Sequence, residues 1–250
     1  MKDTSAEQRL EPTEIQWSKY AEHYDQMCEN NPSYAEMVQL VVDRALSRDL
    51  PREAQVLDVG AGTGNLIASL AQQKPDWNFV HLDYDPGMNA KASEKYKSFG
   101  LENVSITQEA AEEATFTQDS FDLILSTNAI YAIPNHESLL ENIRTWLSDN
   151  GTFIAVDFGR PQNTTDWMIY IARNLIREKG FGQTLRIFRE NWEAAKQNRR
   201  TTEAQKDGNY WVHNNSEFRA TLERIGFKVE ENAECYRGYS DLAVCTKRTV

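Results

Sequence analysis

The hydrophobic and polar positions of the chain follow two repeat lengths, and the change from one to the other marks the expected strands and helices. Between residues 55 and 158, short apolar runs alternate with stretches whose apolar residues recur every three or four positions. The runs predict five strands: Val56–Val59, Phe79–Leu82, Val104–Thr107, Phe121–Ser126 and Thr152–Phe158. Alternating strands and helices of this kind predict an α/β fold with a mainly parallel sheet covered on both faces.

Helical spacing dominates on both sides of this alternating region. The first fifty residues predict two helices separated at Asn31-Pro32-Ser33, and Thr13 with Gln16 forms a capping-box pair before the first. Within the alternating region, Asn135 is expected to cap a helix that Asp149-Asn150-Gly151 ends. Residues 163–214 predict further, strongly charged helices.

The last part of the chain predicts one more helix and two more strands. Ser216–Ile225 has helical spacing, and Phe227–Glu231 and Tyr239–Thr246 predict an antiparallel pair at one edge of the sheet. We therefore expect one domain overall, made of four segments: an N-terminal helical lid (1–50), an α/β core (51–160), a helical insertion that covers a substrate (161–214), and a closing helix with strands (215–250).

Composition narrows the class of protein without naming a function. The chain has 250 residues and a net charge of −11, which argues against nucleic acid and membrane surfaces as partners because both need a basic face. No apolar run is long enough to span a bilayer, and the polar start of the chain predicts no secretory signal. Three scattered cysteines are typical of a reduced, cytoplasmic protein and offer no spacing for a metal site.

A glycine-rich loop after the first strand of the core is the most informative motif. Gly60-Ala61-Gly62-Thr63-Gly64 leads straight into a helix, as in loops where a nucleotide approaches the backbone closely. Its third glycine comes one position too early for the dinucleotide fingerprint, and the Lys-Ser/Thr of a phosphate loop is absent. Asp58, just before the loop, suits a ligand that carries a cationic amine.

The loop and three later segments together resemble the class I S-adenosylmethionine-dependent methyltransferases, in the branch that modifies small molecules. The further segments, in the order of the family, are Val80–Met88, Asp119–Ile124 and Asn128–Asn135. The resemblance implies a Rossmann-like, doubly wound, mainly parallel seven-stranded sheet with an antiparallel edge strand. It also implies N-terminal helices and a helical insertion after the fifth strand.

The same resemblance implies a set of cofactor-binding residues. Asp83 would accept hydrogen bonds from the ribose hydroxyls, and Tyr20 or Tyr24 would reach the cofactor from the lid. Where the family has an acidic residue for the adenine amino group, this chain has Ala110, next to Glu109. The implied S-adenosylmethionine contacts are Tyr20, Asp58, Gly60, Ala61, Gly62, Gly64, Asp83, Tyr84, Met88, Glu109, Ala110, Ala111 and Asn128.

Methyl transfer needs few catalytic groups, because alignment of the reactants and exclusion of water supply most of the rate. The sequence accordingly shows no catalytic triad. Its candidate catalytic residues are His213, as a general base, together with Tyr131 and Tyr24. Residues 173–206 carry a net charge of +5, which indicates either a solvated helical face or an insertion whose Arg186 or Arg189 meets an anionic, carboxylate-bearing small acceptor. The candidate substrate contacts are Tyr24, Tyr131, Arg186, Arg189 and Tyr210.

Other functions remain open at this point. The same fold could methylate a peptide or tRNA. A non-catalytic S-adenosylmethionine-binding or regulatory module is the alternative from another class, and a nicotinamide dehydrogenase is a fourth hypothesis. The sequence predicts no metal, and it leaves open the acceptor, the methylated atom, the need for a general base and the oligomeric state.

Overall fold

The computed structural model describes residues 17–248, so the predicted Thr13–Gln16 capping pair lies outside the described residues. Two N-terminal helices, α1 (Trp17–Glu29) and α2 (Pro32–Leu46), precede the first strand. The break between them falls at the predicted Asn31-Pro32, because proline lacks the N–H that would continue a helix.

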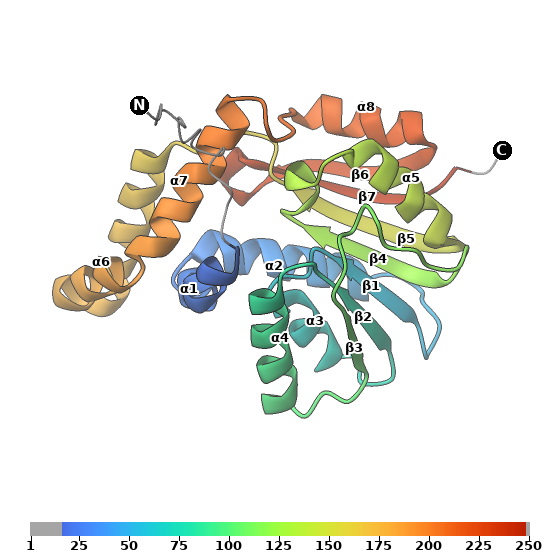
Figure 1. The fold of residues 1–250 in the computed structure, drawn as a ribbon, viewed down its shortest axis with the longest axis horizontal. Coiled ribbons are helices and arrows are strands. Elements are labelled where there is room, and N and C mark those ends of the chain that lie inside the picture. Colours follow the sequence, from blue (N-terminus) through green and yellow to red (C-terminus); the bar gives the residue numbers. More distant parts are fainter. Residues whose placement is uncertain (1–16, 249–250) are drawn as a thin grey trace, which may run out of the picture.

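A single seven-stranded sheet forms the centre of the molecule, with the strand order β3-β2-β1-β4-β5-β7-β6 (Figure 1). Its strands are β1 (Gln55–Val59), β2 (Asn78–Leu82), β3 (Val104–Thr107), β4 (Phe121–Thr127), β5 (Leu147–Asp157), β6 (Phe227–Cys235) and β7 (Ser240–Lys247). The first five strands are parallel, and β7 is antiparallel to both β5 and β6. The expected mainly parallel α/β sheet is confirmed, with the antiparallel strand one position in from the edge that β6 forms.

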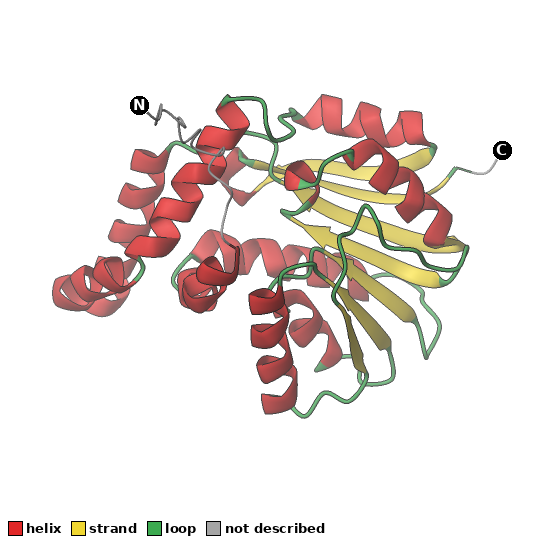
Figure 2. Ribbon diagram, in the orientation of Figure 1, coloured by secondary structure: helices red, strands yellow, loops and turns green. Residues whose placement is uncertain are grey.

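Helices cover both faces of this sheet, giving three layers (Figure 2). Side chains of β1 alternate between the two faces: Val56 packs against α2, α3 (Asn65–Ala71) and α4 (Pro86–Ser98), whereas Leu57 faces α5 (His136–Trp146) and α8 (Asn215–Ile225). Burial on both faces explains why the central strands are almost continuously apolar. Because β1 to β5 are parallel, their carboxyl ends lie along the same side of the sheet. α/β proteins bind ligands along this edge, which the carboxyl ends of the strands form.

The helical insertion leaves the sheet at that same edge. It consists of α6 (Thr164–Glu190) and α7 (Trp192–Lys206), which run out from the body beside α1 and return (Figure 1). Gly180, at φ 77° and ψ 166°, divides α6 into two helical halves. Two short 3-10 turns complete the fold, Ile130–Ala132 after β4 and Tyr236–Gly238 between β6 and β7.

Two local expectations were wrong in detail. The helix α5 ends at Trp146, and Asp149-Asn150-Gly151 lies inside β5, where the register with β4 shifts. Asn135 does stand at the start of α5, but it has a left-handed backbone (φ 55°) and its side chain makes no capping hydrogen bond. In both places packing against the neighbouring strand and helix sets the backbone conformation, and this packing overrides the local propensity of the sequence.

Candidate active site

The glycine loop is fixed by hydrogen bonds to the neighbouring strand. The N–H groups of Gly60 and Ala61 donate to the carbonyl of Leu82 at 2.9 and 3.1 Å, and the N–H of Gly62 donates to Oδ2 of Asp83 at 2.8 Å. Gly62 has a φ of 58°, and a Cβ built on it would meet no atom within 4 Å. The loop thus presents bare backbone to open space, as a close-fitting ligand requires.

Two carboxyl groups lie at the ends of β1 and β2 beside this loop. Asp58 is 1% exposed, and its Oδ1 has no hydrogen-bond partner. Burial, reinforced by the charge of Asp83, raises the pKa of Asp58 to about 8. Burial also raises the pKa of Asp83, although the N–H groups of Asp85 and Gly62 oppose that shift by donating to its carboxylate.

These features fit the sulfonium nucleoside that the sequence implies. An unpartnered buried carboxyl at Asp58 suits an amino group, since a cation would satisfy its free oxygen and restore its charge. Asp83 retains oxygen lone pairs for hydroxyl donors, and the open side of Gly62 leaves room for a ligand against the backbone. The residues present therefore match the chemistry of S-adenosylmethionine.

Helix α1 covers this loop. The hydroxyl of Ser18 donates to the carboxylate of Asp85 at 2.9 Å, and Oδ1 of Asp25 accepts from the hydroxyl of Thr63 at 2.5 Å. Lys95 of α4 completes the attachment through an ion pair with Asp25 at 2.9 Å. The N-terminal helix is thus tied to the glycine loop by polar contacts.

The remaining predicted cofactor residues occupy varied positions around this site. Met88 is buried against Tyr20, whereas Tyr84 is 55% exposed. Ala111 is buried, Ala110 is half-buried and Glu109 is exposed. The amide of Asn128 is held from two sides: Nδ2 contacts Sδ of Met37 at 3.3 Å, and Oδ1 accepts from Ser240 at 2.9 Å.

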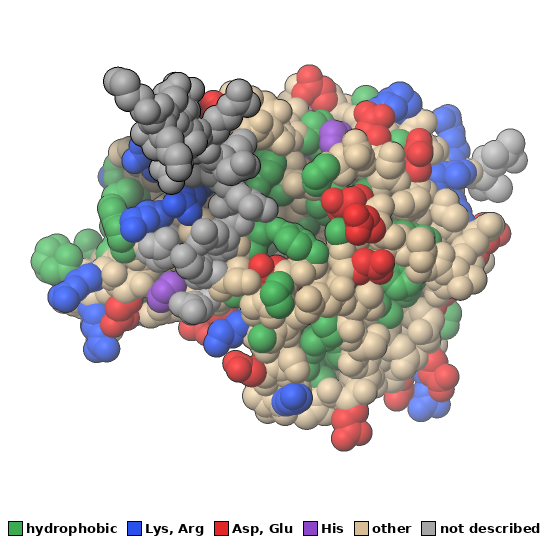
Figure 3. Space-filling model, in the orientation of Figure 1, with side chains coloured by type: hydrophobic (Ala, Val, Ile, Leu, Met, Phe, Trp, Pro, Cys, Tyr) green, Lys and Arg blue, Asp and Glu red, His purple; other side chains and the backbone are tan. Residues whose placement is uncertain are grey.

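A cavity of about 200 Å³ lies beside this site, between the sheet edge, α1 and the insertion. In the space-filling view, hydrophobic side chains surround a hollow between the insertion and the rest of the molecule (Figure 3). Aromatic rings supply much of its wall: Trp17, Tyr20, Tyr24, Tyr34, Tyr131, Phe158, Trp167, Phe188, Trp192 and Tyr236. None of the described residues that line it is charged.

The predicted substrate residues divide into two groups. Tyr24 and Tyr131 line the cavity, and Tyr210 packs edge-on against Tyr131 from outside it, with ring centroids 5.5 Å apart. Arg186 and Arg189 are exposed and do not line the cavity, because Ile187 and Phe188 occupy the inward face of that helix. Arg186 instead pairs with Glu190 at 2.7 Å, so neither arginine supports an anionic acceptor in this cavity.

Several lining residues were not anticipated as site residues. The sequence pattern identified Asn31 only as part of a break between two helices, and it gave no role to Trp167 or Asn198. Asn198 accepts a hydrogen bond from the hydroxyl of Tyr20 at 2.6 Å, which joins α7 to α1 across the cavity. These residues are far apart in the chain, so no local spacing could have brought them together. The available signal was Tyr20 and Tyr24 of the first helix, which the family resemblance implied as contacts of the cofactor.

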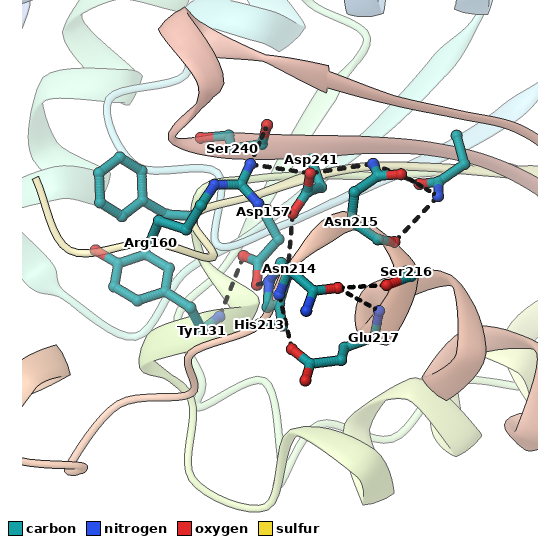
Figure 4. A network of polar contacts seen from close by, with 12 residues as sticks. Tyr131, Asp157, Arg160, His213, Asn214, Asn215, Ser216, Glu217, Ser240 and Asp241 are labelled. Atoms are coloured by element: carbon teal, nitrogen blue, oxygen red, sulfur yellow. Dashed lines mark hydrogen bonds and ion pairs between the residues drawn. The ribbon is translucent and has the colours of Figure 1, made fainter.

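His213 lies in a buried network beneath the loop that follows β4 (Figure 4). Its Nε2 is 3.2 Å from Oδ2 of Asp157, and its Nδ1 is 3.2 Å from Oδ2 of Asp241, an ion-pair contact whose geometry falls short of a hydrogen bond. Arg160 pairs with Asp241, and the other oxygen of Asp157 accepts from the N–H of Tyr131 at 3.1 Å. The network therefore holds the backbone of a cavity residue.

This network makes His213 a cation. Burial lowers the pKa of His213, but the contacts of its ring with the carboxylates of Asp157 and Asp241 outweigh burial and raise the pKa to about 9. A protonated imidazole cannot accept a proton, and His213 does not line the cavity. We therefore do not propose His213 as a general base.

A family model described as a methyltransferase domain matches residues 50–215, which is more than half of the chain. Among curated proteins, the malonyl-acyl-carrier-protein O-methyltransferase of a Paenibacillus species is 28% identical over 127 residues, covering 50% of this chain and 46% of that protein. The trans-aconitate 2-methyltransferase of Deinococcus radiodurans is 36% identical over 98 residues, covering 39% of this chain and 35% of that protein. In both cases the match spans less than half of the relative's own length.

Solved structures share the fold over nearly the whole chain. An S-adenosylmethionine-dependent methyltransferase from Aquifex aeolicus superposes with a TM-score of 0.61 at 16% identity, covering 93% of this chain and 98% of that one. A structure from Methanococcus maripaludis described as an S-adenosylmethionine-dependent methyltransferase gives 0.61 at 18% identity, with 93% and 94% coverage. Within residues 17–248, no helix combines the length and hydrophobicity needed to cross a membrane.

Proposed function

Because the chain belongs to the methyltransferase domain family, an S-adenosylmethionine-dependent group of enzymes, we propose that it transfers the methyl group of this cofactor to a small organic acceptor. The acceptor would occupy the aromatic cavity between α1, the insertion and the sheet edge. The observation that carries this proposal is that residues lining the cavity reach the glycine loop: the hydroxyl of Tyr34 accepts from Asn65, the residue after the loop, at 3.2 Å, and Asn128 precedes Ala129, which packs on Gly60.

The cofactor would lie along the carboxyl ends of β1 and β2. We assign its amino group to Asp58, its ribose hydroxyls to Asp83 and the close backbone approach to Gly62. Tyr20 and Met88, packed together, would form the apolar side facing α1. The remaining residues of the implied set, Gly60, Ala61, Gly64, Tyr84, Glu109, Ala110, Ala111 and Asn128, stay as proposed contacts around this core.

When bound, S-adenosylmethionine supplies an activated methyl group. Transfer of this group to a lone pair of the acceptor leaves a neutral thioether, and any proton that the acceptor loses passes to solvent. The residues of this chain position the reactants and limit the access of water to them. Tyr131 is held through its backbone by Asp157, and the aromatic walls exclude water from the reacting atoms. Burial raises the pKa values of Tyr24 and Tyr131, so both stay neutral near pH 7 and neither acts as a base there.

The names of the relatives support a small acceptor. One relative is named for a malonyl group on a carrier protein and another for trans-aconitate. The alternatives, a peptide or tRNA substrate or cofactor binding without catalysis, draw on no specific feature of the described residues. The uncharged, largely aromatic wall of the cavity and its volume of about 200 Å³ favour a small molecule over both kinds of macromolecule.

Ligand-induced thermal shifts test this proposal. S-adenosylhomocysteine should raise the melting temperature, whereas NAD should not, because the glycine loop lacks the dinucleotide spacing. Asp83→Asn keeps an oxygen for the Gly62 N–H but loses the charge, and it should weaken S-adenosylhomocysteine binding at least tenfold. The matched control is Glu102→Gln, an exposed amide substitution away from the site.

Turnover separates an enzyme from a binding module. Labelled S-adenosylmethionine should transfer its methyl group to a small molecule in a deproteinised cell extract, and mass spectrometry would identify the product. Stabilisation by NAD alone would contradict the proposed function, and stabilisation by S-adenosylhomocysteine without transfer to any acceptor would favour the non-catalytic alternative.

A further inference from the structure

Three buried polar atoms, each on a residue that lines the aromatic cavity, have no hydrogen-bond partner among the residues that the structure describes. They are Oδ1 of Asn31, Nε1 of Trp167 and Oδ1 of Asn191. Asn31 is 3% exposed and Trp167 is 6% exposed. Leaving a buried polar atom unpaired costs roughly 1–3 kcal/mol, so folded proteins seldom keep such atoms without a reason.

The partners of these side chains identify which atom each one leaves free. Nδ2 of Asn31 donates to the hydroxyl of Tyr236 at 3.0 Å, so its amide nitrogen is engaged and its oxygen is available. Nδ2 of Asn191 likewise donates to the carbonyl of Ile187 at 2.9 Å. The indole of Trp167 packs on Tyr236 with ring centroids 4.9 Å apart, which places one free donor and one free acceptor around the same tyrosine.

The wall around these atoms supplies no charge. Two cations approach the wall from outside, and neither lines the cavity: Arg237 stacks over the ring of Trp167 at 4.8 Å and pairs with Asp166 at 2.8 Å, and the exposed Lys179 donates to Oδ1 of Asn30 at 2.6 Å. Burial raises the pKa values of Tyr20 and Tyr236 well above the ordinary value, so these hydroxyls stay uncharged. A carboxylate, phosphate or ammonium would lose its hydration here without gaining a counter-charge.

Size and shape limit the ligand further. A volume of about 200 Å³ lies below the roughly 300–1,000 Å³ of typical ligand sites, so the occupant is small. Aromatic walls favour a flat ring, which packs against them edge-on or offset. Amides and an indole N–H then fix its orientation, since only a polar group on the ligand can satisfy them.

We propose that the methyl acceptor is a small, neutral, ring-bearing molecule with a hydroxyl group, which donates to Oδ1 of Asn31 and accepts from Nε1 of Trp167. Asn191, at the junction of α6 and α7, provides a second acceptor for another donor on the ligand. This assignment rests on the proposed function and specifies the acceptor of the same site. It replaces the anionic acceptor that the basic insertion had predicted.

Three phenols with short para substituents of different charge test the assignment. The probes are 4-ethylphenol, which is neutral, 4-hydroxyphenylacetate, which is anionic, and tyramine, which is cationic. Each is titrated into the protein saturated with S-adenosylhomocysteine, and binding is followed by calorimetry and by the fluorescence of the cavity tryptophans. We expect 4-ethylphenol to bind at least tenfold more tightly than either charged phenol.

Two variants test the assigned atoms. Asn31→Leu keeps the side-chain size without the oxygen, and Trp167→Phe keeps a ring without the N–H. Each should weaken 4-ethylphenol binding about tenfold while leaving the affinity for S-adenosylhomocysteine unchanged, which also shows that the variant is folded. Trp77→Phe is the matched control, because Trp77 packs beside Phe79 away from the cavity, and it should leave 4-ethylphenol binding unchanged.

The outcomes separate this inference from the proposed function. Tighter binding of 4-hydroxyphenylacetate or tyramine, or no binding of 4-ethylphenol by a protein that still binds S-adenosylhomocysteine, overturns the neutral acceptor alone. Unchanged 4-ethylphenol affinity in both Asn31→Leu and Trp167→Phe overturns the assigned atoms. Failure of the wild-type protein to bind S-adenosylhomocysteine counts instead against the proposed function.

Discussion

The carboxyl group of Asp58 is buried away from water. Its protonation state therefore depends on the charge of a ligand that binds beside it. Its pKa is raised to about 8 in the free protein, and a cationic amine next to it would lower that value. Below pH 8, binding of such an amine therefore has to expel a proton from Asp58. The affinity for S-adenosylhomocysteine should accordingly rise from pH 6 to 8, by up to about tenfold per pH unit, and then level off.

Calorimetry across this pH range tests the coupling. Asp58→Asn cannot titrate and should bind with an affinity that changes little with pH. Adenosine, which lacks the amino acid moiety, is the matched ligand control and should show a flat profile with the wild-type protein. Equal slopes for wild type and Asp58→Asn would assign the pH dependence to another group.

Gly180 shows how one backbone position shapes an entire element. Its φ of 77° with ψ of 166° lies in a region open essentially to glycine, and it divides α6 into two halves. Gly180→Ala should cost about 1–3 kcal/mol of unfolding free energy, as judged by urea denaturation. Gly182→Ala is the matched control: Gly182 is helical, has no positive φ and would place its new Cβ in open space, so this variant should gain about 0.4–1 kcal/mol. A loss of stability in Gly182→Ala as large as in Gly180→Ala would contradict this explanation of the kink.

Individual elements show what the sequence could and could not predict. β3 was predicted with its exact bounds, and the glycine loop was recognised because strand, turn and helix are consecutive in the chain. The roles given to Arg186 and Arg189 rested on charge alone. Only the packing of Ile187 and Phe188 against the cavity sets the rotation of that helix, and this information is not local.

The acceptor cavity is a property of the whole chain. Its wall combines residues 17–34 with the loop after β4, the insertion and Tyr236 near the C-terminus. Asn31 and Trp167 become neighbours only because α2 and α6 both pack on the turn that holds Tyr236. Sequence analysis could therefore predict the cofactor loop, which is contiguous, whereas the acceptor site required the assembled fold.

The His213 network ties the sheet, the end of the insertion and the acceptor loop together, so its protonation affects the stability of the whole molecule. Burial lowers the pKa of His213, but Asp157 and Asp241 outweigh it and raise the pKa to about 9, against the ordinary 6.5 of an unfolded chain. The contribution to stability is therefore complete below pH 6.5 and is lost as the pH rises through 9. At about 1.36 kcal/mol per pKa unit, this contribution amounts to roughly 3 kcal/mol at most.

Urea denaturation between pH 6.5 and 9.5 measures this contribution. The wild-type protein should lose up to about 3 kcal/mol of unfolding free energy relative to His213→Gln over that range. His81→Gln is the matched control: burial lowers the pKa of His81 to about 4, so its removal should leave the wild-type slope intact above pH 6.5. If His213→Gln kept that slope, another group would carry the titration. Because Asp157 also holds the N–H of Tyr131 and native His213 loses its charge only near pH 9, acceptor affinity should fall around pH 9, a higher pH than that at which global stability begins to decline.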